Sequence, residues 1–233
     1  MAMAAASSHE AELGWGTRPI TPQQANEFAV KVPASAREQV IIARNLVAYP
    51  PSIAVRGVFF EGMARLVTEA RGPGAINALR KKAGLPEQAT AFRQYPHRDF
   101  YKLYYLAAPL LHPGGSFTQA LHRTARTFFP IFRNSLLGRT MGAFMGDEPR
   151  TILPLLAKAY NLSVAGNEHS SELVADRQVR WRCRVEPVEW YEETFAGIVE
   201  GTAADPTRAG LTVRMVSKKL RDGAMDYEFD IGW

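Results

Sequence analysis

The sequence predicts an α+β fold in which a helical N-terminal two-thirds packs on a small C-terminal antiparallel sheet. Apolar residues recur with helical spacing through much of residues 54–160. After residue 162 the pattern changes, because residues 179–185 alternate strictly between apolar and arginine side chains. Asp222-Gly223 is a strong hairpin signal near the C-terminus. Helices and strands in separate runs are typical of α+β folds.

The composition is that of an ordinary globular protein. The chain has 233 residues, of which 46% are hydrophobic and 22% charged, with a net charge of +5. We expect residues 1–34 to be an N-terminal tail, because prolines and small polar residues break the helical period there. Residues 35–233 are then expected to form a single α+β domain. We expect no membrane span, since no run of 18 apolar residues occurs, and a cytoplasmic protein, since the N-terminus lacks a secretory-signal pattern.

The helical part divides at prolines and glycines. We expect helices at 54–71, 74–83, 99–111, 117–128, 131–145 and 149–160. Pro109 and Pro130 are each expected to kink a helix or mark its end, because proline removes a helical hydrogen bond. Strands are expected at 179–185, 211–218 and 225–233, with a helix inserted between the first and second that begins near Pro187 and fades by Asp205.

Charges on two of these strands are complementary. One face of the first strand carries three arginines, and one face of the last carries three acids: Arg180, Arg182, Arg184, Asp226, Glu228 and Asp230. If the two strands are neighbours, these side chains form a cross-strand ionic ladder, each pair contributing roughly 0.2–1 kcal/mol. The arginine row is then a solvated sheet face, and we expect no nucleic-acid binding.

Signals for catalysis or metal binding are weak. The histidines show no metal-ligand spacing: His9, His97, His112, His122 and His169. The one cysteine, Cys183, lies on the apolar face of a strand, which favours a buried, inert thiol over an acylation site. No nucleophile elbow or glycine-rich phosphate loop occurs. Acid/base-capable groups gather between Tyr95 and Tyr101, but at a helix start, where capping and docking explain them more simply than catalysis.

Several short stretches resemble a family of unknown function that is expanded as many paralogues in myxobacteria. They span about residues 40 to 233 and are Val55-Arg56-Gly57-Val58-Phe59-Phe60-Glu61-Gly62, Tyr95-Pro96, Asp99-Phe100-Tyr101, Leu137-Gly138-Arg139, Ala159-Tyr160 and the ending Tyr227-Glu228-Phe229-Asp230-Ile231-Gly232-Trp233. That family is distantly similar to the fold shared by haem-nitric-oxide-binding domains, vinyl-reductase-type domains and TRAPP trafficking subunits. The resemblance implies helices on a small antiparallel sheet and a binding or scaffold role.

The resemblance raises haem as a candidate cofactor. A haem iron needs a proximal ligand on a helix, and His122 is the histidine well inside a predicted helix. The Tyr-x-Ser-x-Arg motif of the haem-binding relatives is missing from this sequence. The cysteine cluster of the vinyl-reductase-type domains is missing too. We therefore expect no cofactor.

An aromatic and methionine set in the helical part supplies candidate ligand-binding residues. We expect these side chains, with Arg139 for an anionic group, to line a pocket: Phe59, Met63, Tyr101, Tyr104, Phe128, Phe132, Arg139, Met141 and Phe144. Helical spacing alone predicts a solid core for the aromatic and methionine side chains, and arginines of these helices are more simply explained as surface residues paired with acids such as Glu61 or Asp147. Both interpretations stay open at this point.

Two functions follow. The first is a non-enzymatic small-molecule-binding or sensory module that takes a hydrophobic or anionic ligand. The alternative is a protein-interaction or assembly module, homodimeric or bound to a partner protein, in which the same apolar surface packs against a second chain. An enzyme that uses residues 95–101 is the least favoured.

Overall fold

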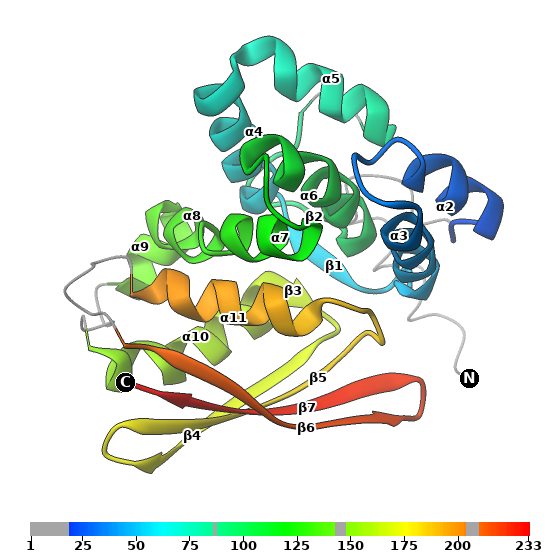
Figure 1. The fold of residues 1–233 in the computed structure, drawn as a ribbon. Helices are drawn as coiled ribbons and strands as arrows, with labels where there is room; N and C mark the ends of the chain where they lie inside the picture. Colours follow the sequence, from blue (N-terminus) through cyan, green and yellow to red (C-terminus); the bar gives the residue numbers. More distant parts are fainter. Residues whose placement is uncertain (1–18, 86–87, 143–147, 204–209) are drawn as a thin grey trace, which may run out of the picture. The chain divides into compact units, whose positions relative to one another are not determined.

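A computed structural model describes residues 19–85, 88–142, 148–203 and 210–233. Its chain divides into two compact units, Met1–Leu111 and His112–Trp233, and each is described by itself. Helices and antiparallel strands are mixed, and a C-terminal antiparallel sheet is present, so the predicted α+β class is confirmed (Figure 1). A single domain over residues 35–233 stays a prediction.

The first unit is mainly helical. Its elements are α2 (Pro22–Ala29), α3 (Ala36–Ala48), β1 (Ala54–Arg56), α4 (Val58–Arg71), α5 (Pro73–Ala83), β2 (Gln94–Pro96) and α6 (His97–Leu111). β1 and β2 pair antiparallel, with Val55 opposite Tyr95. α6 is buried along most of its length and contacts α3, α4 and α5. It is therefore the central helix of this unit.

α2 lies within residues 1–34, and the expectation that prolines break the helical period there is wrong for residues 22–29. Thr21 and Gln24 form a capping box, and Pro22 occupies the first helical turn, where its missing N–H costs nothing. Phe28 is buried, and α2 packs against α3. The proline that suggested a break in the helical period instead begins a helix.

β1 corrects the start of the helix predicted at residue 54. Residues 54–56 are extended, and α4 begins only after Gly57. A Cβ on Gly57 would lie 2.1 Å from the Thr90 carbonyl oxygen and 2.7 Å from the Tyr95 ring. The chain needs glycine here because two backbone segments meet without room for a side chain.

Aromatic rings fill the core of the first unit around α6. Tyr49, His97 and Tyr101 are mutually in contact, with ring centroids 4.7 to 5.3 Å apart. Asn45 donates a buried 3.0 Å hydrogen bond from Nδ2 to the Tyr105 hydroxyl. Edge-to-face and offset ring pairs contribute about 0.5–1.5 kcal/mol each beyond their buried area. The Tyr95–Tyr101 stretch is therefore part of a packed core, as its interpretation as a docking segment requires.

The second unit contains the sheet. Its elements are α7 (Phe117–Ala125), α8 (Phe128–Asn134), α9 (Leu136–Gly142), α10 (Pro149–Ser163), β3 (Val164–Ala165), β4 (Glu168–Ala175), β5 (Gln178–Val185), α11 (Tyr191–Thr202), β6 (Thr212–Arg221) and β7 (Ala224–Gly232). The four long strands are ordered β4-β5-β7-β6, and every neighbouring pair is antiparallel. The predicted hairpin at Asp222-Gly223 is confirmed, because both residues have positive φ.

The single helix predicted at 131–145 is interrupted at Ser135, which separates α8 from α9, and residues 143–145 lie outside the described part of the chain. Ser135 ends α8, and its hydroxyl accepts a 3.0 Å hydrogen bond from the Gly138 N–H at the start of α9. Pro130 lies in the first turn of α8 and does not kink it. Strand β4 was missing from the predicted strands altogether.

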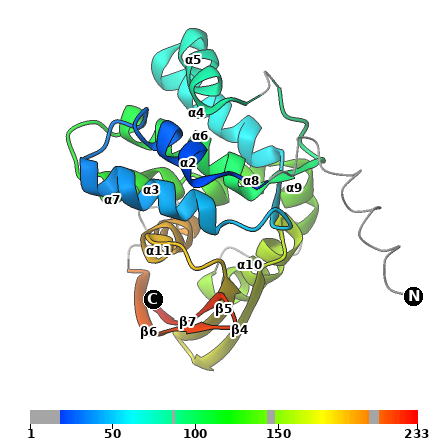
Figure 2. The same ribbon diagram turned by 90° about the vertical axis from the view of Figure 1, so that its right-hand side faces the viewer.

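α10 and α11 lie on one face of the sheet, as Figures 1 and 2 show from two sides. The Phe195 ring of α11 lies 5.2 Å from Trp181 of β5 and 4.4 Å from Phe229 of β7, measured between ring centroids. Tyr191 stacks on Tyr227 at 4.9 Å. The apolar halves of the two alternating strands are thus covered by one helix.

α7 packs on the opposite side of α11 through two glycines. A Cβ on Gly197 would lie 2.4 Å from the His122 carbonyl oxygen, and one on Gly201 would lie 2.2 Å from the Arg126 carbonyl oxygen. Both contacts involve backbone, which has little freedom to give way. The two helices are therefore in backbone contact.

Gly197→Ala should lower the free energy of unfolding by about 1–3 kcal/mol, because the new methyl group overpacks the contact between α7 and α11. Guanidinium titration followed by tryptophan fluorescence measures the change. The control is Gly74→Ala in α5, where an added Cβ meets nothing within 4 Å. That variant should be unchanged or more stable by up to about 1 kcal/mol. Equal stability of the two variants would contradict the packing.

Candidate functional site

The outer face of the sheet, turned away from α10 and α11, carries charges from all four strands. The register places Glu168 of β4, Arg184 of β5, Asp226 of β7 and Lys219 of β6 in one cross-strand row. The row of Glu172, Arg180, Asp230 and Arg214 follows the same alternation of acid and base. In the row between them, Ser170 and Ser217 flank the pair of Arg182 and Glu228. The charged members of this face are Glu168, Glu172, Arg180, Arg182, Arg184, Asp226, Glu228, Asp230, Arg214, Lys219 and Arg221.

The predicted ionic ladder between β5 and β7 is confirmed. Arg180 donates from Nε to Asp230 Oδ1 at 2.5 Å and from Nη1 to Glu228 Oε1 at 2.9 Å. Arg182 donates from Nε to Glu228 Oε2 at 3.2 Å, and Arg184 donates from Nη1 to Asp226 Oδ1 at 3.0 Å. Each arginine thus bonds at least one acid of β7, and the arginine row is largely neutralised.

Asp230 is the most enclosed acid of the ladder. Its side chain is 7% exposed and is also bonded by Arg214, whose Nη2 lies 2.7 Å from Oδ2. The hydrogen bond from Arg180 holds the pKa of the Asp230 carboxyl below its usual range, and the bond from Arg214 adds to this effect. The same bond to Asp230 raises the pKa of the Arg180 guanidinium.

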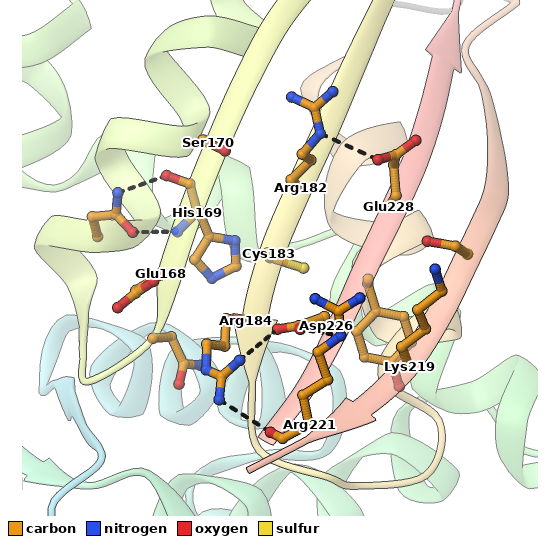
Figure 3. A pocket seen from close by; sticks show the side chains of 14 residues that line it. Glu168, His169, Ser170, Arg182, Cys183, Arg184, Lys219, Arg221, Asp226 and Glu228 are labelled. Carbon is orange, nitrogen blue, oxygen red and sulfur yellow. Dashed lines mark hydrogen bonds and ion pairs between the residues drawn. The ribbon is translucent and has the colours of Figure 1, made fainter. Parts of the chain in front are cut away.

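A trough of about 620 Å³ lies on the sheet (Figure 3). All four long strands contribute to its lining, together with the end of α10 and the turn that precedes β4. The lining residues are Asn161, Asn167, Glu168, His169, Ser170, Arg182, Cys183, Arg184, Ser217, Lys219, Arg221, Asp226, Tyr227 and Glu228. We call this set the trough throughout.

Two asparagines fix one end of the trough. The Asn161 side chain bonds the backbone of His169 twice, accepting from its N–H and donating to its carbonyl oxygen, each at 2.8 Å. Asn167 donates a 3.1 Å hydrogen bond to Glu186 Oε2. These bonds hold the last turn of α10 against β4. The wall of the trough is therefore preformed on this side.

The trough contains charges of both signs. In the middle of one row, Arg184 and Asp226 are paired with each other. At the two ends of that row, Glu168 and Lys219 have no ion-pair partner among the residues that the structure describes. A charged ligand group could therefore pair with Lys219 without breaking an existing ion pair. This arrangement suits a small ionic molecule.

The pocket candidates from the sequence belong to different units. In the first unit, Met63, Tyr101 and Tyr104 are buried and Phe59 is half-buried. In the second, Phe128 and Phe132 are buried on α8, whereas Arg139 is exposed on α9. The Met141 side chain and Phe144 lie outside the described part of the chain. A cavity shared by all nine side chains stays a prediction.

The trough was missed by the sequence analysis because β4 was missed. One face of β4 carries Glu168, Ser170 and Glu172, and the other carries His169, Ser171 and Leu173. Because both sets are mostly polar, the apolar–polar alternation that predicts a strand is weak here. A search for acidic residues that could pair with Arg180, Arg182 and Arg184 from each of the two edges of their strand could have found β4.

His122 does not fit the role of a haem ligand. Its Nε2 lies 2.9 Å from Glu200 Oε2, so the atom that would bind iron is already engaged. Its backbone is in contact with α11 at Gly197, which leaves no space for a macrocycle between these helices.

In the described ranges, no group of three or more histidines, cysteines and acids is placed to hold a metal ion. None of the helices described there is long and apolar enough to cross a membrane.

Cys183 is a buried thiol, as the alternation of its strand predicts. It is 5% exposed, and Sγ lies 3.4 Å from the Tyr191 hydroxyl. Burial raises the pKa of the Cys183 thiol to about 12. The thiolate that would attack a reagent is thus nearly absent at neutral pH.

Lowering the pH should destabilise the protein partly through Asp230. Because its folded-state pKa lies below the unfolded value, its stabilisation is present above the unfolded pKa and is lost as pH falls through the folded one. Asp230→Asn should therefore be less stable than the parent at pH 7 and lose less further stability towards pH 2. Urea midpoints measured between pH 2 and 7 test this. Parallel curves for the two proteins would contradict it.

Cys183 should react with a thiol reagent such as 5,5′-dithiobis(2-nitrobenzoate) only after unfolding. At pH 8 the rate should be at least about 100-fold lower in the folded protein than in guanidinium, because both burial and the raised pKa suppress the thiolate. Absorbance at the reagent's product band gives the rate. Since the chain has one cysteine, any rapid labelling of the native protein would show that the thiol is accessible.

Solved structures of haem domains share this fold. One, described as "Modulating Heme Redox Potential Through Protein-Induced Porphyrin Distortion", is 13% identical with a TM-score of 0.59, covering 76% of this chain and 99% of that one. An oxygen-binding H-NOX domain related to soluble guanylate cyclases gives the same identity and TM-score, covering 76% and 94%. A third, described as "Structural insights into the molecular mechanism of H-NOX activation", is 14% identical with a TM-score of 0.58, covering 76% and 95%. At these identities the likeness shows the fold alone.

No curated protein matches the sequence significantly. A protein family does, and its description is "Protein of unknown function (DUF2378)". The match covers residues 50–233, which include most of the first unit and the whole of the second. The chain therefore belongs to the DUF2378 family.

Proposed function

We propose that this chain is a non-enzymatic, small-molecule-binding module of the cytoplasm, and that the trough takes the ligand. The observation that carries the proposal is the trough itself, whose volume of about 620 Å³ falls within the range of about 300–1,000 Å³ typical of ligand sites. Its walls come from regular strands and a clamped helix end, which favours a preformed site.

The lining favours an ionic ligand over a hydrophobic one. Lys219 offers an ammonium group without an ion-pair partner among the described residues, and Ser170 and Ser217 add hydroxyls. Within each unit, by contrast, the aromatic side chains pack against other aromatic side chains of the same unit. We therefore place an anionic or zwitterionic small molecule in the trough.

A sensory role fits this assignment. Several structural neighbours are described as H-NOX domains, one of them in complex with oxygen, and a shared fold supports a related use by analogy. Haem itself is not part of the proposal, because His122 is bonded to Glu200 and packed on α11. Most of the guanidinium groups in the trough are committed to cross-strand ion pairs, which supports binding over acid–base catalysis.

Native mass spectrometry of freshly purified protein, repeated after denaturation, should reveal a small bound mass that is lost on unfolding. A panel of anionic and zwitterionic metabolites should then contain compounds that raise the melting temperature as their concentration rises. Absence of both an adduct and any such shift would overturn the proposal. A clean dimer without an adduct would instead favour the assembly alternative.

Ser170→Trp should abolish the ligand-dependent rise in melting temperature, because an indole on β4 fills the trough. Val174→Trp is the matched control, since Val174 is 44% exposed on the same strand and lies outside the lining. The control should respond to ligand as the parent does. If both variants still bind, the ligand lies elsewhere.

A further inference from the structure

β6 is an end strand of the four-stranded sheet. β7 pairs with one of its edges, and in the described part of the chain no strand of the sheet lies beyond the other. Nearly all of its ten residues are exposed. Its outer edge therefore presents a row of backbone N–H and C=O groups on which another extended segment could pair.

Side chains on both faces of β6 extend this surface. The outer sheet face carries three cations, Arg214, Lys219 and Arg221, of which Lys219 has no ion-pair partner among the described residues. The opposite face carries Met215 and Leu220, which are 47% and 64% exposed. These apolar side chains lie beside the edge and are largely uncovered.

The pairing of β6 with β7 shows which side chains are compatible with a neighbour of β6. On its inner edge, β7 places Asp226 opposite Lys219 and Asp230 opposite Arg214. On the other face it places Phe229 opposite Met215 and Met225 opposite Leu220. The preferred neighbour of β6 thus alternates acidic and apolar residues. Each side chain of a strand can contact the strands on both of its edges. A strand that paired with the outer edge of β6 would therefore meet the same cations and apolar side chains as β7 does.

We propose that the free edge of β6 binds an extended segment of another protein in which acidic and apolar residues alternate. The segment would add to the sheet as a fifth strand, gaining backbone hydrogen bonds from the edge and selectivity from the cations and apolar side chains. This interaction surface is distinct from the ligand site in the trough, although Lys219 and Arg221 belong to both.

The same charges disfavour a second copy of this chain as the partner. If β6 paired with β6 of another copy, the row of Arg214, Lys219 and Arg221 would face its own cations, which is destabilising. A bulge between Met215 and Ser217 interrupts the regular ladder and further restricts which strands can pair. Such features protect an edge from indiscriminate pairing while leaving a complementary strand acceptable.

A synthetic peptide that copies β7 (Ala224–Gly232) is the probe. Labelled with a fluorophore, it should bind the full chain with a micromolar dissociation constant, measured by anisotropy. A peptide with its three acids changed to Asn, Gln and Asn should bind at least about tenfold more weakly, and 0.5 M salt should weaken the acidic peptide. No saturation up to 1 mM, or equal binding of the two peptides, would overturn the proposal.

Two variants place the peptide on β6. Lys219→Glu and Leu220→Asp should each weaken binding at least about fivefold, whereas Val174→Asp, an exposed site on β4 at the far edge of the sheet, should not. Ser170→Trp should leave peptide binding intact, which separates this surface from the trough. Equal effects of Leu220→Asp and Val174→Asp would refute the assignment.

Hydrogen exchange distinguishes edge pairing from replacement of β7. Bound peptide should slow exchange of β6 amides and leave β7 amides protected. Faster exchange in β7 would mean that the peptide displaces the strand it copies. A rise in mass with protein concentration in the absence of peptide, together with slower exchange of β6 amides, would mean that a second copy occupies the edge. Either result would contradict the proposal.

Discussion

The second unit depends on the register between β5 and β7. In this register Trp181 lies beside Phe229 under α11, and Arg182 lies beside Glu228 on the outer face. A slip of one residue would bury the charged side chains and expose the aromatic ones, so both faces enforce the same alignment. α11 can cover the inner face only because the aromatic side chains gather there. The charged trough exists on the outer face for the same reason.

This dual constraint explains which features the sequence could predict. Strict alternation in β5 and β7 specifies the two faces of each strand, so the burial of Cys183 follows from spacing alone, whereas the ladder also required the two strands to be neighbours. The Asp222-Gly223 turn joins β6 to β7 through a local signal. Stripe-forming helices such as α6 and α10 were predicted at nearly their observed boundaries. These features share one property, which is that a short window of residues contains the whole signal.

Features set by distant contacts could not be predicted in this way. Whether proline begins or breaks a helix depends on its position, as Pro22 shows in α2 and Pro130 in α8. Residues 54–56 are extended because they pair with β2, and Gly57 lies where the Thr90 carbonyl and the Tyr95 ring leave no room for a side chain. The trough needs four strands in register, one of which, β4, has little apolar content. Its outline therefore appears only when the strands are assembled.

The two outer edges of the sheet are not equivalent. On β4 the Asn161 amide reproduces with His169 the pair of hydrogen bonds that a neighbouring strand would make. Any strand that added at this point would have to displace a side chain whose own polar atoms would then need new partners. On β6 the described residues offer no equivalent substitute. At His169 the border of the sheet is thus capped by a side chain of the same protein, whereas the described residues leave the backbone along the outer edge of β6 open to a strand that comes from outside.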